Sequence, residues 1–287
     1  MGKLIVHWSP LHGQARTTSS MGAVALAMNR VTGGRVCITN TQHDDKADLE
    51  GMFNSRMSEE NKQLLYQAAG LNALISNIKR DKLTAEDVEG STMPTPIKNV
   101  ELLPGVRLEG SISAEDETDR LIYKILTEAV RDTYDWTFVD LAAGNVPLSK
   151  RLMKAADIVV VTLSQNRAMW DMFFDQYEEV AERENVFYLI GGHKSDSVYS
   201  AKNFSRMYQA YGTRLKTTGI VPDCVGYMDA ISEGLVPSFF MMNRRAARKE
   251  ENGEFIEECV NTATKLKTFA DMLDGEPEGG RDNERGE

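Results

Sequence analysis

Short runs of apolar residues, each followed by a longer segment of helical periodicity, constrain the fold of this chain more than any other feature. Such continuous runs are typical of strands that are buried on both faces of a parallel sheet. The intervening segments carry one apolar stripe each, as amphipathic helices do. The alternation predicts a doubly wound, mostly parallel α/β sheet flanked by helices. The predicted strands are Leu4–Val6, Val36–Ile38, Phe138–Val139, Ile158–Val161 and Phe187–Ile190, and the clearest helical stripes lie at Met21–Val31 and Ile122–Val130.

The alternation stops between residues 44 and 99, where we expect a helical insertion after the second strand. Its apolar residues follow a helical spacing that is broken near Gly70. Three prolines then mark the return to the sheet through a strand at residues 100–103. The stripe of the insertion comprises Leu64, Leu65, Ala68, Leu71, Ile75 and Ile78, and the prolines are Pro94, Pro96 and Pro104.

The end of the chain divides into a helix and a tail. Residues 255–273 have the pattern of an amphipathic helix, whereas residues 274–287 are acidic and rich in glycine. We expect the tail to be disordered, because it has too little apolar surface to bury. The sequence therefore predicts a single α/β domain over residues 1–273.

Composition excludes several classes of protein. The net charge of −10 argues against a surface that is basic all over, although a local basic patch can still meet nucleic acid. Cys37, Cys224 and Cys259 show no Cys-x-x-Cys spacing, which favours a reducing compartment, and neither they nor the histidines form a zinc pattern. No run approaches the length of a membrane span. We expect a cytoplasmic protein.

The loop after the first strand is the clearest candidate site. It reads Ser-Pro-Leu-His-Gly-Gln-Ala-Arg-Thr-Thr at residues 9–18 and leads into a helix predicted at 17–31. Unpaired backbone N–H groups and the positive end of the helix dipole converge at such a turn, so it can hold a phosphate chain. The simpler alternative is an ordinary turn between strand and helix with capping threonines.

At these residues the chain resembles the ParA/MinD family of P-loop ATPases, whose deviant Walker A loop reads Lys-Gly-Gly-x-Gly-Lys-Thr-Thr. The resemblance implies a P-loop NTPase type of fold and a site for ATP or ADP with Mg²⁺. The matching residues are Ser9, Pro10, Gly13, Thr17 and Thr18. The resemblance implies cofactor contacts from Gly13, Gln14, Ala15, Arg16, Thr17, Thr18, Asn40, Gly144 and Pro222, and magnesium contacts from Thr17 and Asp140.

Several departures from the family pattern predict slow or absent hydrolysis. The family's two lysines are replaced by Leu11 and Arg16, and two of its glycines by His12 and Ala15. Arginine is bulkier than lysine in a tight loop, and alanine leaves less room for a close phosphate. Asn40 and Gln42 stand where the family has an Asp-x-Asp sequence, and amides are poor general bases and poor ligands for hard cations.

A second matching region follows the strand at Phe138–Val139. Asp140 resembles the Walker B aspartate, and the Ala143–Gly144 peptide is placed to sense a γ-phosphate through its N–H. The alternative for Asp140 is a capping or solvated carboxylate at a strand end. Residues 218–223 lie near where the family holds adenine, but the family's asparagine is not evident at Gly191–Gly192.

Three segments are candidates for partner contacts. Arg244, Arg245, Arg248 and Lys249 form a basic run close to where ParA-like proteins bind DNA nonspecifically, and the alternative is a solvated helix face paired with nearby glutamates. We expect residues 169–174 to serve helix packing. The helix at 255–273 resembles a MinD-type membrane helix in position, but its glutamates oppose anionic lipid, so we expect it to pack on the domain.

The resemblance implies a dimeric, nucleotide-dependent switch that positions DNA, a pilus or a secretion or conjugation system through protein partners. The helical insertion and residues 227–240 resemble most the TadZ/CpaE branch of pilus-localisation proteins, although its receiver-like domain does not precede Leu4. Two alternatives remain: a scaffold that binds no nucleotide, and an active DNA-partition ATPase in which Arg16 does the work of the lysine.

Overall fold

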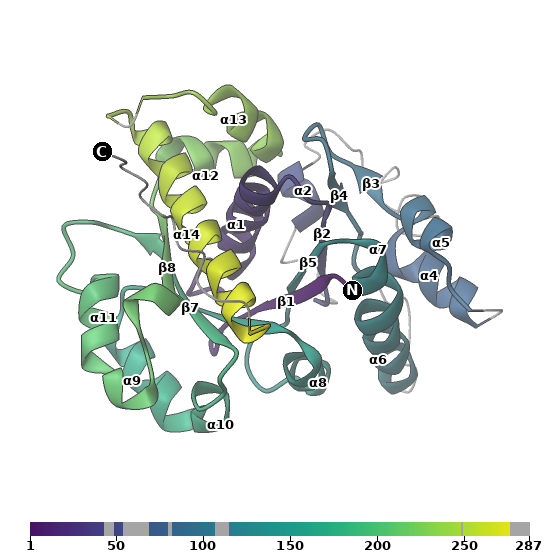
Figure 1. The fold of residues 1–287 in the computed structure, drawn as a ribbon, viewed down its shortest axis with the longest axis horizontal. Helices are drawn as coiled ribbons and strands as arrows, with labels where there is room; N and C mark the ends of the chain where they lie inside the picture. Colours follow the sequence, from purple (N-terminus) through teal and green to yellow (C-terminus); the bar gives the residue numbers. More distant parts are fainter. Residues whose placement is uncertain (43–48, 54–68, 80–81, 107–114, 248, 276–287) are drawn as a thin grey trace, which may run out of the picture.

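The computed structural model describes residues 1–42, 49–53, 69–79, 82–106, 115–247 and 249–275 (Figure 1). Its centre is an eight-stranded sheet with the order β3-β4-β2-β5-β1-β6-β7-β8, parallel except for the edge strand β3. The predicted doubly wound sheet and its strands are therefore confirmed. The strands are β1 (Lys3–Trp8), β2 (Val36–Asn40), β3 (Met93–Pro94), β4 (Val100–Leu102), β5 (Trp136–Asp140), β6 (Ile158–Leu163), β7 (Val186–His193) and β8 (Thr218–Pro222).

Helices cover both faces of the sheet (Figure 1). One face carries α1 (Thr17–Thr32), α2 (Leu49–Phe53), α12 (Val225–Ser232), α13 (Val236–Met242) and α14 (Glu251–Leu273). The other face carries α4 (Gly70–Ile78), α5 (Ala85–Gly90), α6 (Glu115–Lys124), a π-helix η2 (Ile125–Val130), α8 (Pro147–Ala155), α9 (Arg167–Gln176), α10 (Glu178–Ala181) and α11 (Ala201–Met207). Shorter elements are α7 (Arg131–Thr133) and the 3-10 turns η3 (Gln209–Tyr211) and η4 (Leu215–Thr217).

The central strand β1 shows why these runs form a buried sheet. Leu4, Val6 and Trp8 enter the core under α6, α8 and α9, while Ile5 enters the core under α1 and α14. Side chains alternate between the faces of a strand, so an apolar residue is required at nearly every position. His7 is the polar exception on the α1 face, and both of its ring nitrogens are buried without a described partner. Burial lowers its pKa to about 3.

The insertion between β2 and β4 contains α2, α4, α5 and β3. Its helical character is confirmed where it is described, and α4 begins at Gly70, where the break was expected. Leu64, Leu65 and Ala68 lie outside the described residues. Residues 276–287 of the predicted tail also lie outside them. The disorder expected for that tail thus stays a prediction.

Two expectations about packing are confirmed. In α14, Phe255, Cys259 and Leu266 are buried in the core, and the helix packs on α1 and β8. In α9, Trp170 is fully buried and its indole N–H donates to the carbonyl of Ser164 at 2.7 Å. Within the described ranges, no helix has the length and apolar character that a membrane crossing requires.

Candidate functional site

The loop between β1 and α1 presents a row of free amides. Among the described residues, none of the backbone N–H groups from His12 to Ser19 donates a hydrogen bond. The first backbone hydrogen bond at the start of α1 runs from the Ser20 N–H to the Arg16 carbonyl at 2.9 Å. Gly13 has φ 71, and a Cβ built there would meet nothing within 4 Å. The loop therefore turns its glycine to open space at the positive end of α1, which suits an anion.

The loop rests on the end of β7. Ala15 is buried, and its carbonyl oxygen would lie 2.3 Å from a Cβ on Gly191, so only glycine fits beneath it. A bulge interrupts the pairing of β7 with β8 between Gly191 and His193, and Gly192 takes φ 62 there. Such bulges re-aim the chain at the end of a sheet. Here the bulge makes room for the loop and its arginine.

Arg16 adopts a left-handed backbone, with φ 56, that is unusual for a residue other than glycine. Its side chain lies against Gly192 and forms an ion pair with Asp223, directly after β8. The other carboxylate oxygen of Asp223 lies 3.6 Å from the ammonium of Lys194. The hydrogen bond from Arg16 holds the pKa of Asp223 below its usual range. The cation predicted to meet phosphate is thus engaged by an acid in this conformation.

Asp140 is fully buried beneath the first turn of α1. Its Oδ2 accepts hydrogen bonds from the Thr18 hydroxyl at 2.5 Å and from the Gln42 amide at 2.9 Å. Its Oδ1 has no partner among the described residues. Burial raises the pKa of Asp140 to about 7, against the lowering effect of its hydrogen bonds, and nearby Glu50 raises it further. The structure places Thr18, the neighbour of the predicted Thr17, in contact with this carboxylate.

Glu50 on α2 is a buried carboxylate that sequence reasoning missed. Its Oε1 accepts the Asn40 side-chain amide at 3.0 Å and the Gly105 N–H at 2.8 Å. Asn40 is itself only 3% exposed, so its side chain serves this contact and not the rim where a ligand would lie. Only its acidic side chain could have pointed to it in the sequence. Glu50 lies in the segment where the strand–helix alternation stops, so its position relative to the sheet could not be predicted.

The side-chain amides of Asn40, at the end of β2, and Gln42, just after it, therefore do more than remove charge. Asn40 lies directly opposite Asp140 in the parallel register of β2 and β5. Its amide donates to Glu50, and the amide of Gln42 donates to Asp140. Each replacement of a carboxylate by an amide supplies an N–H donor to a carboxylate on another element, which removes the repulsion that a further charge would bring.

Gly144 ties the loop after β5 to the loop at residues 9–18. Its N–H donates to the Ser9 carbonyl at 3.1 Å, and its own carbonyl accepts the Trp8 indole N–H at 3.1 Å. Its φ of 73 favours glycine. The N–H that was expected to sense a γ-phosphate is thus occupied in this conformation, and it reaches a ligand only if the contact with Ser9 opens.

The remaining predicted residues separate into two groups. Pro222 ends β8 beside Asp223, so the structure brings the expected adenine side to the same rim as Arg16. Arg244, Arg245 and Lys249 are exposed in the turn and bend after α13 and do not form a helix face, while Arg248 lies outside the described residues. The alternative of a helical basic face is therefore wrong for the described members of this run.

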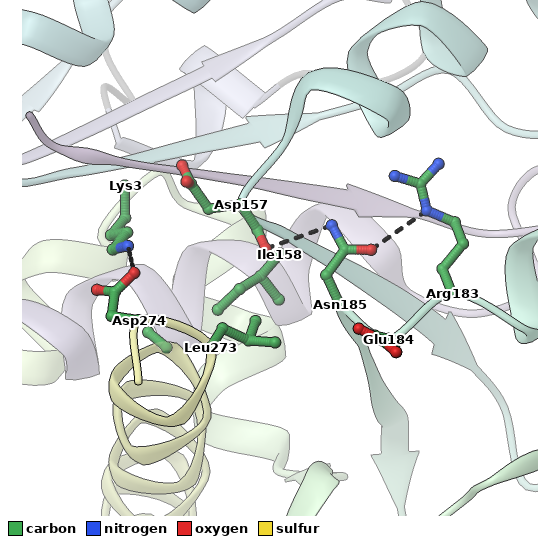
Figure 2. Close-up of a pocket in the computed structure, with 9 residues that line it drawn as sticks. Lys3, Asp157, Ile158, Arg183, Glu184, Asn185, Leu273 and Asp274 are labelled. Carbon is green, nitrogen blue, oxygen red and sulfur yellow. Dashed lines mark hydrogen bonds and ion pairs between the residues drawn. The ribbon is translucent and has the colours of Figure 1, made fainter. Parts of the chain in front are cut away.

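Two described hollows lie away from this rim. One, of about 530 Å³, opens at the amino ends of β1, β6 and β7 beneath the last turn of α14 (Figure 2). Lys3 pairs there with Asp274 at 2.5 Å, and Asn185 bridges Arg183 and the carbonyl of Asp157. Because these groups bind one another, we assign the hollow a structural role.

The residues at the carboxyl edge fit a nucleotide with magnesium in part. The free amides of residues 12–19 suit phosphates, and the unpaired Asp140 Oδ1 with the Thr18 hydroxyl suits the hydration shell of a hard cation. Within the described ranges no cluster of three or more His, Cys, Asp or Glu residues can hold a metal by itself. The cation would therefore come with the phosphates.

Known structures share this architecture. A ParA family ATPase from Chlorobium tepidum TLS aligns with a TM-score of 0.66 and 10% identity over 92% of this chain and 99% of that one. A chain of the MinC:MinD cell division protein complex of Aquifex aeolicus aligns with a TM-score of 0.59 and 14% identity over 97% and 98%. The septum site-determining protein MinD of Pyrococcus horikoshii OT3, complexed with Mg-ADP, gives 0.57 and 13% over 94% and 99%.

At the level of sequence, no protein-family model and no curated protein matches the chain. The structural likeness shows the fold. The chain shares the fold of these ParA/MinD structures, with an eight-stranded, mostly parallel sheet flanked by helices. The predicted fold is confirmed, and the roles expected for residues 9–18 and 138–145 stay predictions.

Proposed function

We propose that this protein is a nucleotide-dependent dimeric switch of the ParA/MinD type that positions DNA or a protein assembly, with weak or no ATP hydrolysis. Its ligand is ATP or ADP with Mg²⁺, bound at residues 12–18 and beside Asp140. The observation that carries the proposal is the row of amides from His12 to Ser19, which find no acceptor among the described residues at the start of α1.

The residues present support binding better than chemistry. The amides of the loop would hold phosphate oxygens, and Thr18 and Asp140 would orient water around the cation, whose charge neutralises the phosphates. Asn40 and Gln42 are committed as donors to Glu50 and Asp140, and an amide cannot take a proton from an attacking water. We therefore expect the protein to bind the nucleotide but to hydrolyse it slowly or not at all.

A switch needs no hydrolysis to work. A ligand that binds the closed, dimeric form more tightly than the open one shifts the population toward the dimer. Leu11 cannot reach across to the phosphates of a second subunit as the family's early lysine does, so the dimer would depend on other contacts of this rim. The partners would be proteins of a pilus, secretion, conjugation or partition system, in the cytoplasm, and the TadZ/CpaE branch remains a proposal.

Nonspecific DNA is a further proposed partner. Arg244, Arg245 and Lys249 are exposed after α13, and such cations contact backbone phosphates without reading sequence. DNA that stimulates steady phosphate release, abolished by Asp140→Ala, would instead support an active partition ATPase.

The proposal is tested by titrating Mg-ATP into the purified chain in a calorimeter and by sedimentation with and without nucleotide. We expect saturable binding, a dimer with Mg-ATP, and phosphate release that stays near the protein-free blank while the dimer persists. Absence of heat at high micromolar protein would exclude the nucleotide switch and leave a scaffold without nucleotide.

A further inference from the structure

The arginine of the phosphate loop is held by an acid from the opposite side of the rim. Arg16 is the only lysine or arginine in residues 9–18, so it is the loop's only permanent cation. Its guanidinium pairs with Asp223, which follows β8. The backbone of Asp223 is fixed by a hydrogen bond from its N–H to the His193 carbonyl at 2.9 Å. The acid is therefore a built part of the site.

The surroundings are shaped for this contact. The Cδ, Nε and Cζ atoms of Arg16 all lie 3.1 Å from the position of a Cβ on Gly192, so a side chain there would press against the arginine where it crosses the bulge of β7. Arg16 also has a left-handed backbone, with φ 56. Both features cost conformational freedom, which argues that the pair is a specific arrangement.

From this geometry we infer that Asp223 is a specificity-determining residue that competes with the phosphate chain for Arg16. With the site empty, Asp223 neutralises the loop's cation. A ligand gains Arg16 only by displacing the carboxylate, so a single weak anion gains little, whereas a chain of several phosphates gains enough to replace it. The inference rests on the proposed phosphate site and adds a threshold of ligand charge to it.

The exchange is physically accessible. The side chains of Arg16 and Asp223 are 41% and 30% exposed, and ion pairs with this exposure are weak because water screens them. When Arg16 leaves, Lys194 still lies 3.6 Å from the other oxygen of Asp223, so the carboxylate keeps a cation. No buried charge is left unpaired by the exchange.

The test is the affinity for sodium tripolyphosphate, which probes the phosphate site without a base or ribose, measured by calorimetry beside Mg-ATP. We expect Asp223→Asn to bind tripolyphosphate about two- to fivefold more tightly than the wild type, as removal of a weak competing ion pair requires. Asp229→Asn is the matched control, since Asp229 is an exposed acid on α12 and the charge change is the same. It should change the affinity little.

Arg16 decides whether the gain is specific. In an Arg16→Ala background, Asp223→Asn should give no gain beyond that of the control, because the two residues act through one contact. Equal or weaker binding by Asp223→Asn, a gain that survives Arg16→Ala, or no tripolyphosphate binding by any variant would overturn the inference. Saturable Mg-ATP binding by the wild type would leave the proposed function standing in each of these cases. Absence of Mg-ATP binding, with the expected tripolyphosphate pattern intact, would count against the nucleotide function alone.

Discussion

At the scale of single residues, the main finding is how two amides and two carboxylates share a buried corner. The sequence predicted that Asn40 and Gln42 weaken the site by removing charge. The structure shows in addition that they donate to Glu50 and Asp140, so they are required by their surroundings. This could not be predicted, because Glu50 reaches Asn40 through tertiary packing and not through any sequence spacing.

A change of Asn40 to aspartate therefore should not restore the family's acidic pattern without cost. We expect Asn40→Asp to lower the free energy of unfolding at neutral pH by about 3 kcal/mol, because it replaces a donor by a second buried charge facing Glu50. Urea denaturation monitored by circular dichroism gives the value.

The compensating variant combines Asn40→Asp with Glu50→Gln, which exchanges donor and acceptor across the same contact. It should recover part of the lost stability, since it removes the second buried charge and the new amide at position 50 can donate to the new carboxylate at position 40. Recovery is not complete, because Glu50 Oε1 accepts both the Asn40 amide and the Gly105 N–H, and an amide nitrogen in that position cannot accept the latter. A double variant as unstable as the single one would show that the contact does not control this corner.

At the scale of elements, the strands of the sheet were predictable because they are buried on both faces and leave continuous apolar runs. The long helices were predictable from their stripes. The π-helix at Ile125–Val130, the bulge at Gly191–His193 and the role of Asp223 were not, because each depends on contacts between distant segments. The loop at residues 9–18 was identified as a candidate site from its position after β1, whereas its ion pair could not be predicted from the sequence.

The last helix, α14, allows a test between packing on the domain and the alternative of lying on a membrane. Leu266 is fully buried on its inner face, and Leu273 near its end is 41% exposed. We expect Leu266→Ala to destabilise the fold by about 2 to 5 kcal/mol, as large-to-small changes in a core do. Leu273→Ala makes the same change at an exposed site of the same helix and should stay within about 0.5 kcal/mol of the wild type.

Chemical denaturation of both variants in the absence of lipid decides this point. Equal, small effects would mean that α14 is not anchored on α1 and β8, and the MinD-like membrane role would then regain weight. A large effect at Leu266 alone would show that the apolar face is committed to the domain.

At the scale of the whole molecule, the amino and carboxyl ends of the strands differ in the groups that they present. The amino edge carries a hollow whose charged groups bind one another, while the carboxyl edge gathers the amides of residues 12–19, Asp140 and the Arg16–Asp223 pair. In open α/β sheets, ligands bind outside the carboxyl ends of the strands. The chain is acidic as a whole, with a net charge of −10. The free N–H groups at this edge nevertheless suit an anion locally.

The central claim is that the loop's amides hold the phosphates of a nucleotide, and Gly13 allows a direct test. Its φ of 71 is accepted by Asn and Asp nearly alone among other residues, and a side chain there would enter open space. Gly13→Asp should weaken Mg-ATP binding at least about tenfold, which is about 1.4 kcal/mol, by placing a carboxylate among the amides. Gly13→Asn has the same shape without the charge and should stay within a few-fold of the wild type in the same calorimetric titration. Equal binding by the wild type and Gly13→Asp, or no binding by the wild type, would contradict the claim.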